Sequence, residues 1–244
     1  EVAARLNQPE YDQWLWFHVR RKAEFILKMM TTTEPIHQPF EGPVVPQHKD
    51  NPDLTLVAEP AQNGLIVGRM DWHRPLLFIN AVSYRGLMDA ASLAERVNQT
   101  ADAQRWRNAA MKLQQSWEQA FKSPEIENDR TFSSSLWPTW VATSDDNQEK
   151  FSQALQKRWS QLRNSQGEFL VPPLWTYFDI AEAHQWLLLN QPERVWSTLR
   201  WFWNHQASPG LYSWWEGKGE ENTFHRWKHI RGWVNPPNVT PHYW

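Results

Sequence analysis

The sequence contains no cysteine among its 244 residues. Disulfide bonds and thiolate metal sites are therefore excluded, while the compartment stays open between the cytoplasm and a periplasmic or secreted location. No apolar run reaches the length of a membrane-spanning helix, and no signal-like segment is found. Lysine and arginine form no concentrated run, and the formal net charge is only −2. Because phosphate backbones bind concentrated basic surfaces, we expect neither a nucleic-acid partner nor a membrane partner.

Motifs for several common chemistries are also missing. No glycine-rich phosphate loop is present, and the serines at 133–135 lack the Gly-x-Ser-x-Gly context of a nucleophile. Glu221, His225 and His229 stand at helical spacing, which could hold zinc. Glycines on both sides of that stretch make a helix long enough to align the three uncertain, and solvated loop histidines are the favoured interpretation. We therefore expect no metal and no cofactor.

Tryptophan is the residue present in excess, with 18 copies against 5 tyrosines and 11 phenylalanines. A large flat ring with one polar edge can fill a core or stack on a sugar ring. Core packing is expected to account for about half of the tryptophans. Those in loops are the informative ones for function.

Apolar periodicity predicts helices over 11–30, 76–97, 101–121, 147–162 and 177–189, and another that starts at Pro192. The helices at 76–97 and 177–189 are apolar on a wide arc and should be buried on two sides, whereas the others carry a single apolar stripe. Asp146 is expected to cap the helix at 147–162. Residues 31–75 are interpreted as one long connection. No alternating strand pattern of useful length and no regularly spaced repeat is recognised.

This alternation predicts a double layer of helical hairpins, with inner helices ringed by outer ones. The loops that lead into the inner helices are rich in aromatic residues. Two of them also carry a carboxylate: Asp71 beside Trp72, and Glu216 beside Trp214 and Trp215. Glycoside hydrolysis needs such a pair, one acid for the leaving oxygen and one carboxylate to activate water or attack.

The assignments of both carboxylates have alternatives. Asp71 could instead cap the following helix and pair with Arg74. Glu220 and Glu221 lie close behind Glu216 and could take the role of base.

The chain resembles a known superfamily in short motifs. The run from Leu77 to Leu87, preceded by an acidic loop, resembles the middle helix of glucoamylase-type hydrolases of the six-hairpin glycosidase superfamily. Gly68, Asp71 and Arg74 are similar to the acid-bearing loop of trehalases and mannosylglycerate hydrolases, although each spacing differs by one residue. Trp215-Glu216, followed by residues 232–235, resembles the base-bearing loop of that superfamily.

The resemblance implies an all-α fold, an (α/α)6 toroid in which six helical hairpins close a ring. Residues 1–244 would then be a single but incomplete toroid domain, because the sequence supplies about half of the helices that such a ring needs. The chain begins at Glu1 rather than methionine. We therefore expect that the remainder of the chain, or another subunit, closes the ring.

The expected function is that of an inverting glycoside hydrolase acting on an α-linked glycan or a small glycoside. Asp71 would be the general acid and Glu216 the general base. A non-catalytic carbohydrate-binding toroid is the alternative from another class, and a lyase or phosphorylase on the same scaffold is a third. The substrate-binding residues would be Trp72, His73, Arg74, Trp137, Trp140, Trp175, Trp214, Trp215, Trp233 and Asn235.

Overall fold

The protein is predominantly helical and also contains a small three-stranded sheet. Two compact units can be distinguished, unit 1 with Glu1–Ser123 and Pro138–Val141, and unit 2 with Pro124–Trp137 and Ala142–Trp244. In the part of the chain that is described, no helix is both long and apolar enough to cross a membrane. The computed structural model describes residues 2–39, 51–70, 74–121, 134–143, 145–170 and 176–205.

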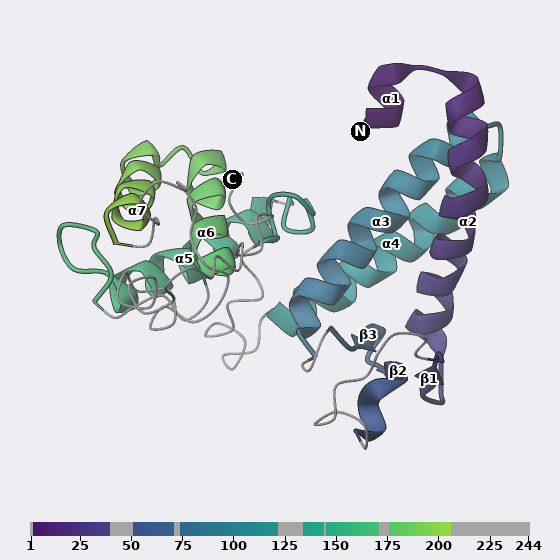
Figure 1. Ribbon diagram of the computed structural model, residues 1–244, viewed down its shortest axis with the longest axis horizontal. Coiled ribbons are helices and arrows are strands. Elements are labelled where there is room, and N and C mark those ends of the chain that lie inside the picture. Colours follow the sequence, from purple (N-terminus) through teal and green to yellow (C-terminus); the bar gives the residue numbers. More distant parts are fainter. Residues whose placement is uncertain are drawn as a thin grey trace, which may run out of the picture. The chain divides into compact units, whose positions relative to one another are not determined.

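Unit 1 is built on three long helices that lie side by side (Figure 1). These are α2 (Pro9–Thr31), α3 (Leu76–Arg96) and α4 (Thr100–Phe121), preceded by the short α1 (Val2–Leu6). The helices predicted at 11–30, 76–97 and 101–121 are therefore confirmed. Proline at the first helical position of α2 fits the missing backbone donor there.

The core of unit 1 lies between α3 and α4. The single apolar stripe predicted for α4 is buried along its whole length, and Trp106 and Trp117 are fully enclosed. The Trp117 indole N–H donates to the Leu77 carbonyl at 3.1 Å, which satisfies the polar edge of a buried ring. The alanines on α3 let α4 approach closely; they are Ala90, Ala91 and Ala94.

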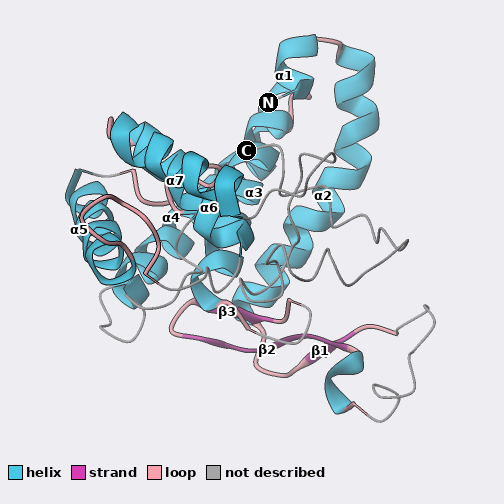
Figure 2. Ribbon diagram, turned by 60° about the vertical axis from the view of Figure 1, so that its left-hand side comes forward, coloured by secondary structure: helices cyan, strands magenta, loops and turns pink. Residues whose placement is uncertain are grey.

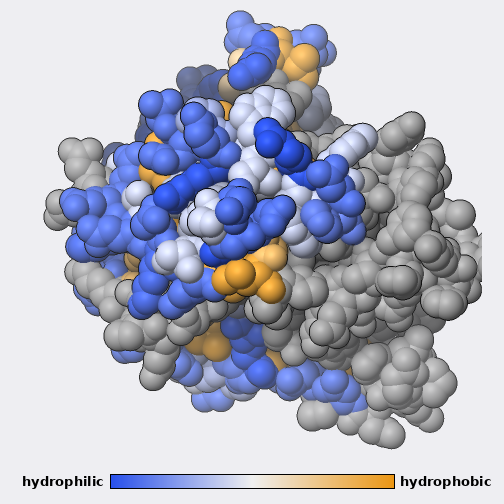
Figure 3. Space-filling model, turned by 90° about the vertical axis from the view of Figure 1, so that its left-hand side faces the viewer, coloured by the Kyte–Doolittle hydropathy of each residue, from blue (hydrophilic) through white to orange (hydrophobic). Residues whose placement is uncertain are grey.

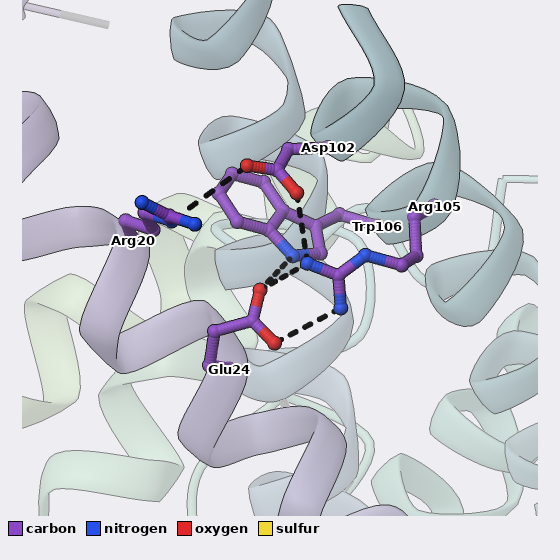
Figure 4. A network of polar contacts seen from close by, with 5 residues as sticks. All are labelled: Arg20, Glu24, Asp102, Arg105 and Trp106. Carbon is purple, nitrogen blue, oxygen red and sulfur yellow. Dashed lines mark hydrogen bonds and ion pairs between the residues drawn. The ribbon is translucent and has the colours of Figure 1, made fainter. Parts of the chain in front are cut away.

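Ion pairs join α2 to the other two helices. Figure 4 shows that Glu24 on α2 accepts from Arg105 and, at 3.1 Å, from the indole N–H of Trp106. Arg105 also donates to Asp102 at 2.8 Å. On the α3 side, Arg96 donates through two nitrogens to Asp12, at 2.8 and 3.0 Å. These contacts fix the rotation of α2 against the α3–α4 pair, which apolar packing alone specifies less tightly.

A sheet occupies part of the segment that was interpreted as one long connection, so the expectation of no strands is wrong. The strands β1 (Ile36–His37), β2 (Leu56–Gln62) and β3 (Leu65–Gly68) pair antiparallel in the order β1-β2-β3, and a 3-10 turn, η2 (Pro52–Leu54), precedes β2. The sheet lies at the end of the helices where α2 ends and α3 begins (Figure 2).

The sequence pattern of β2 explains why it was missed. Leu56 and Ala58 are buried alternately, but the alternation stops at Pro60, which cannot donate to the ladder. The register shifts there by one residue, a β-bulge that accommodates the proline. The turn that follows, Asn63-Gly64, has φ of 52° and 77°, which only such residues adopt readily in a tight hairpin. That dipeptide is a hairpin signal, and it was readable in the sequence.

Asn80 attaches β3 to α3. Its side chain is fully buried, accepts from the Ile66 N–H at 2.8 Å and donates to the Ile66 carbonyl at 2.9 Å. The Asn80 amide therefore hydrogen-bonds to the backbone of β3 in the way that a neighbouring strand would. A Cβ on Gly68 would lie 3.2 Å from Ile79, so glycine permits the close approach of strand and helix at this point.

Unit 2 contains α5 (Asp145–Leu162), α6 (Thr176–Leu188) and α7 (Pro192–His205). Helix α5 begins before Asp146, so that residue lies inside the helix and is not its cap. Helix α6 is buried on a wide arc from residue 179 to 186, as predicted, but Leu187 and Leu188 near its end are exposed. The described surface in Figure 3 is mostly hydrophilic, with a few small hydrophobic patches.

The link between α3 and α4 is a tight three-residue turn, residues 97–99. Asn98 has a left-handed backbone, with φ of 60°, and its N–H donates to the Glu95 carbonyl at 3.0 Å. The next N–H, of Gln99, reaches back to the Ala94 carbonyl at 2.7 Å. This pair of bonds is the Schellman motif, which satisfies carbonyls that the end of a helix leaves open.

The link between α6 and α7 repeats that turn residue for residue. Asn190 has φ of 55° and donates to the Leu187 carbonyl at 3.1 Å, while the Gln191 N–H donates to the Trp186 carbonyl at 2.9 Å. Both links read Asn-Gln and lead directly into the next helix. The two links therefore share one type of turn, whereas the side chains of the helices that they join do not follow a common pattern.

Candidate functional site

Three of the predicted site residues fall in the described part of the chain: Arg74, Trp137 and Trp140. The two candidate catalytic carboxylates, Asp71 and Glu216, lie outside the described residues, as do the alternatives Glu220 and Glu221. The same holds for the other predicted substrate-binding residues, which are Trp72, His73, Trp175, Trp214, Trp215, Trp233 and Asn235.

Arg74 stands directly before α3 and is paired with two carboxylates. Its Nη2 lies 3.2 Å from Asp53 in η2 and 3.1 Å from Glu59 in β2. All three side chains are partly exposed, so each pair contributes little to stability. These ion pairs matter mainly for position, because they hold Arg74 against β2 and the 3-10 turn that precedes it.

Trp137 is placed by α6. Its indole ring stacks on the His184 imidazole, with centroids 4.2 Å apart and planes at 7°. Burial lowers the pKa of His184, so the neutral ring is favoured near neutral pH. A neutral imidazole stacked on an indole makes a flat double layer. Trp137 itself is only half-buried.

The backbone of Trp137 is held by the next residue on α6. Gln185 is fully buried, and its Oε1 accepts from the N–H groups of Leu136 and Trp137 at 3.0 and 3.1 Å. Its Nε2 donates to the Trp137 carbonyl at 2.9 Å and to the Ala181 carbonyl at 3.3 Å. The single Gln185 amide therefore hydrogen-bonds to both the backbone N–H and the backbone carbonyl of Trp137.

Trp140 has an unusual backbone conformation. Its φ is 58°, a left-handed value that is uncommon for a bulky residue with a Cβ. Such a conformation is unfavourable by about 1–2 kcal/mol and persists only where the surroundings impose it. Residues strained in this way cluster at functional sites, which makes Trp140 a candidate on grounds other than residue type.

A buried ion cluster joins α5 to α6. Arg158 donates to Asp179 at 2.7 Å and to Glu182, and all three residues are almost completely enclosed. Burial raises the pKa of Glu182; Arg158 opposes the rise and the nearby Asp179 carboxylate adds to it. For Arg158, burial lowers the pKa, but the two carboxylates outweigh it and the net direction is upward. The cluster therefore keeps its arginine charged while disfavouring the ionised form of Glu182.

A second buried arginine lies near this cluster. Arg163 donates to the Gly167 carbonyl at 3.0 Å and to the Thr198 hydroxyl at 3.1 Å, and its guanidinium lies 3.2 Å from the centroid of Phe169. Burial lowers its pKa to about 10, which leaves it protonated at neutral pH. Arg163 thus ties the end of α5 to α7.

Sequence reasoning missed the polar side chains of α6. Asp179, Glu182 and Gln185 are spaced three residues apart, so they recur once per turn on a helix whose other positions are mostly apolar. On a helix that is buried nearly all round, such residues cannot all reach water and must find partners inside. That spacing was the available signal. Among the described residues, no group of three histidine, aspartate or glutamate side chains could hold a metal ion.

Comparison of the chain with family models, with curated proteins and with solved structures found no match.

Proposed function

We propose that the chain is part of an inverting glycoside hydrolase built on an (α/α)6 toroid, with Asp71 as general acid and Glu216 as general base. The substrate would be an α-linked glycan or a small glycoside. The remainder of the ring would come from further chain or from another subunit. Trp137, Trp140 and the other tryptophans of the aromatic loops would bind sugar rings.

The observation that carries the proposal is the repeated hairpin. Helices α3 and α6 both end in an Asn-Gln Schellman turn that leads into a second helix, which is the unit a ring of helical hairpins repeats. The loop with Asp71 directly precedes α3, and the loop with Trp175 directly precedes α6. In the proposed ring, the carboxylate and aromatic candidates would therefore stand at equivalent junctions.

The described aromatic loop supports the sugar-binding part. Trp137 is half-buried and its ring is supported from one side by His184, and Trp140 has the strained backbone found at functional sites. A rigid aromatic face loses little conformational entropy on binding, which suits it to stacking on a pyranose ring. Arg74, held between Asp53 and Glu59, supports the start of α3 on the side of the acid-bearing loop.

The test is hydrolysis of a glycan panel by the full-length protein, followed by Asp71→Asn and Glu216→Gln. Asp71→Asn should reduce the turnover of substrates with poor leaving groups by at least about 10²-fold, the scale of general acid catalysis. Substrates whose leaving group needs no proton should be affected much less. Glu216→Gln should slow both substrate types alike, because water activation is needed in either case.

The outcomes separate the alternatives. Inversion should be visible in the anomer that forms first, since an inverting pair leaves room for water across about 6.5–9.5 Å. Glycan binding without turnover would support the non-catalytic toroid instead. Dependence on phosphate, or an unsaturated product, would identify a phosphorylase or a lyase. Full activity in both carboxylate variants contradicts the mechanism.

A further inference from the structure

Gln185 hydrogen-bonds to the backbone of an irregular segment. The described stretch 135–143 contains no α-helix and no strand, yet Ser135 and Leu136 are almost fully buried. Within the stretch, the Ala142 N–H donates to the Ser135 carbonyl at 3.1 Å. Buried peptide groups require hydrogen-bond partners, and an unpaired one costs about 1–3 kcal/mol. Gln185 supplies an acceptor to two N–H groups and a donor to one carbonyl of this stretch.

An amide side chain suits this role, because it carries an acceptor oxygen and two N–H donors on one rigid plane. A carboxylate accepts but does not donate, and an ammonium or guanidinium donates but does not accept. Gln185 is itself completely buried and has a further bond to the Ala181 carbonyl of its own helix, which restricts its rotation. The amide is therefore both satisfied and immobilised.

The indole ring is fixed by the adjacent residue of the same helix. The His184 imidazole stacks on the Trp137 ring with centroids 4.2 Å apart, while the Gln185 amide hydrogen-bonds to the Trp137 backbone. Two anchors on consecutive residues of α6 define both the position of the Trp137 Cα and the orientation of its side chain. Loss of the backbone anchor removes the contacts that fix the Trp137 Cα and should loosen the stacked arrangement.

We propose that Gln185 is the positioning residue of a sugar subsite formed by Trp137, and that it sets the orientation of the ring without touching the glycan. This inference rests on the proposed function, because it assumes that Trp137 stacks on a sugar. The subsite would take a pyranose through its apolar face. Gln185 would then control glycan affinity and leave the chemical step unchanged.

The test compares Gln185→Met with Gln114→Met in the full-length protein. Methionine keeps the length of the side chain and removes its hydrogen bonds. Gln114 is the control, because its Nε2 donates at 2.7 Å to a different carbonyl of the same stretch, that of Val141. Gln185→Met should raise KM for an oligosaccharide by up to about tenfold with kcat nearly unchanged, the loss expected for one aromatic contact.

A double-mutant cycle separates positioning from general stabilisation. If Gln185 acts through Trp137, then Trp137→Ala should raise KM much less in the Gln185→Met background than in the wild type. Additive effects would contradict the proposal. An equal rise of KM in Gln114→Met would also contradict it, because the loop as a whole and not the Trp137 anchor would then be responsible.

A spectroscopic readout does not depend on activity. In protein labelled with 5-fluorotryptophan, the fluorine line of residue 137 is assigned by its loss in Trp137→Phe. That line should shift or broaden in Gln185→Met and stay in place in Gln114→Met. An unmoved line in an enzyme that cleaves glycans contradicts the role of Gln185. A moved line in a full-length protein that neither binds nor cleaves any glycan contradicts the proposed function, and with it the assignment of a sugar subsite.

Discussion

Helices α3 and α6 start hairpins that close in the same way but have opposite interiors. Counted back from the asparagine of each turn, Leu87 of α3 corresponds to Asp179 of α6, and Ala90 corresponds to Glu182. All four side chains are buried. The positions that α3 fills with apolar groups are thus filled by carboxylates in α6. The turn specifies the hairpin, whereas these inward positions specify what the hairpin packs against.

The buried side chains of α3 and of α6 stabilise different kinds of contact between helices. Apolar positions on α3 allow close packing with α4, a contact that is strong but imposes little directional order. The carboxylates of α6 require an arginine from α5, and the hydrogen-bond geometry fixes how those two helices are rotated against each other. Buried ion pairs are weak contributors to net stability, but removing one partner is strongly unfavourable.

The largest expected effect is therefore in unit 2. Arg158→Met leaves Asp179 and Glu182 buried without their cation and should lower the free energy of unfolding by about 3–5 kcal/mol. Urea denaturation followed by far-UV circular dichroism measures the loss. The matched change in unit 1, Arg105→Met, removes an exposed ion network and should lower it by about 1 kcal/mol or less.

A rescue variant shows whether the cluster is needed for stability at all. Replacing Asp179 and Glu182 by leucine in the Arg158→Met background should recover part of the lost stability, because no buried carboxylate is left without its cation. The recovery is partial because the buried Arg163 then loses its attraction to both carboxylates. If Arg158→Met and Arg105→Met destabilise to the same extent, the contrast between a buried and an exposed network is wrong.

The next effect concerns a feature that the two helices share. Asn80 on α3 pairs with both the N–H and the carbonyl of Ile66, as Gln185 on α6 does with Trp137. Asn80→Leu leaves two buried peptide groups unpaired and should destabilise by about 2–3 kcal/mol in urea denaturation. Asn108→Leu removes an exposed amide on α4 and should stay within about 0.5 kcal/mol. A small loss at Asn80 would mean that β3 is held by packing instead.

These elements also show how far the sequence alone could be interpreted. Helices were predictable because apolar side chains recur at the helical period over many residues, as in the stripe from Trp106 to Phe121. The sheet was missed because its strands are short and Pro60 interrupts the only alternating run. The dipeptide Asn63-Gly64 is typical of a β-hairpin turn, and it indicates the β2–β3 hairpin that the expectation of no strands left out.

The candidate site was predictable only in residue type. Aromatic loops indicated Trp137 and Trp140, but their partners come from distant positions in the sequence. His184 and Gln185 follow Trp137 by almost fifty residues, and no local pattern links them. Likewise, a pairing of Arg74 with Asp71 was one alternative for the segment before α3, and Asp71 lies outside the described residues. The described contacts of Arg74 are with Asp53 and Glu59, which precede it in the sheet segment. Tertiary partners of polar groups depend on the fold, which composition does not reveal.

A pH titration separates two carboxylates whose pKa values shift in opposite directions, because a hydrogen-bonded arginine dominates at Asp12 and burial dominates at Glu182. Hydrogen bonds from Arg96 hold the pKa of Asp12 below its ordinary value. A group whose pKa is lower in the folded state stabilises at pH above the unfolded value, about 3.9, and that contribution is lost as pH falls through the folded pKa. The stability difference between wild type and Asp12→Asn should therefore shrink as the pH is lowered from about 6 to about 3.

The pKa of Glu182 shifts in the opposite direction to that of Asp12. Because burial raises its pKa, the folded state binds the proton more tightly, and stability is lost as pH rises from the unfolded value of about 4.3 towards the folded pKa. Denaturation of wild type and Glu182→Gln over the same pH range should show that the free energy of unfolding of the wild type falls, relative to that of the variant, as pH rises. Parallel curves for the two variants, Asp12→Asn and Glu182→Gln, would contradict the opposite pKa shifts of these two carboxylates.

The smallest effect tests what the two hairpins have in common. Asn98 and Asn190 both have left-handed backbones, which asparagine tolerates and alanine does not. Asn98→Ala and Asn190→Ala should each destabilise by about 1 kcal/mol, whereas the glycine variants should differ from wild type by only a few tenths. Because the turns are the same and far apart in the chain, the two losses should be equal and additive in the double variant. Thermal or urea unfolding measures all of these. If alanine is tolerated at one turn and not at the other, the hairpins are not copies of one unit, and the repeat that supports a toroid loses its main observation.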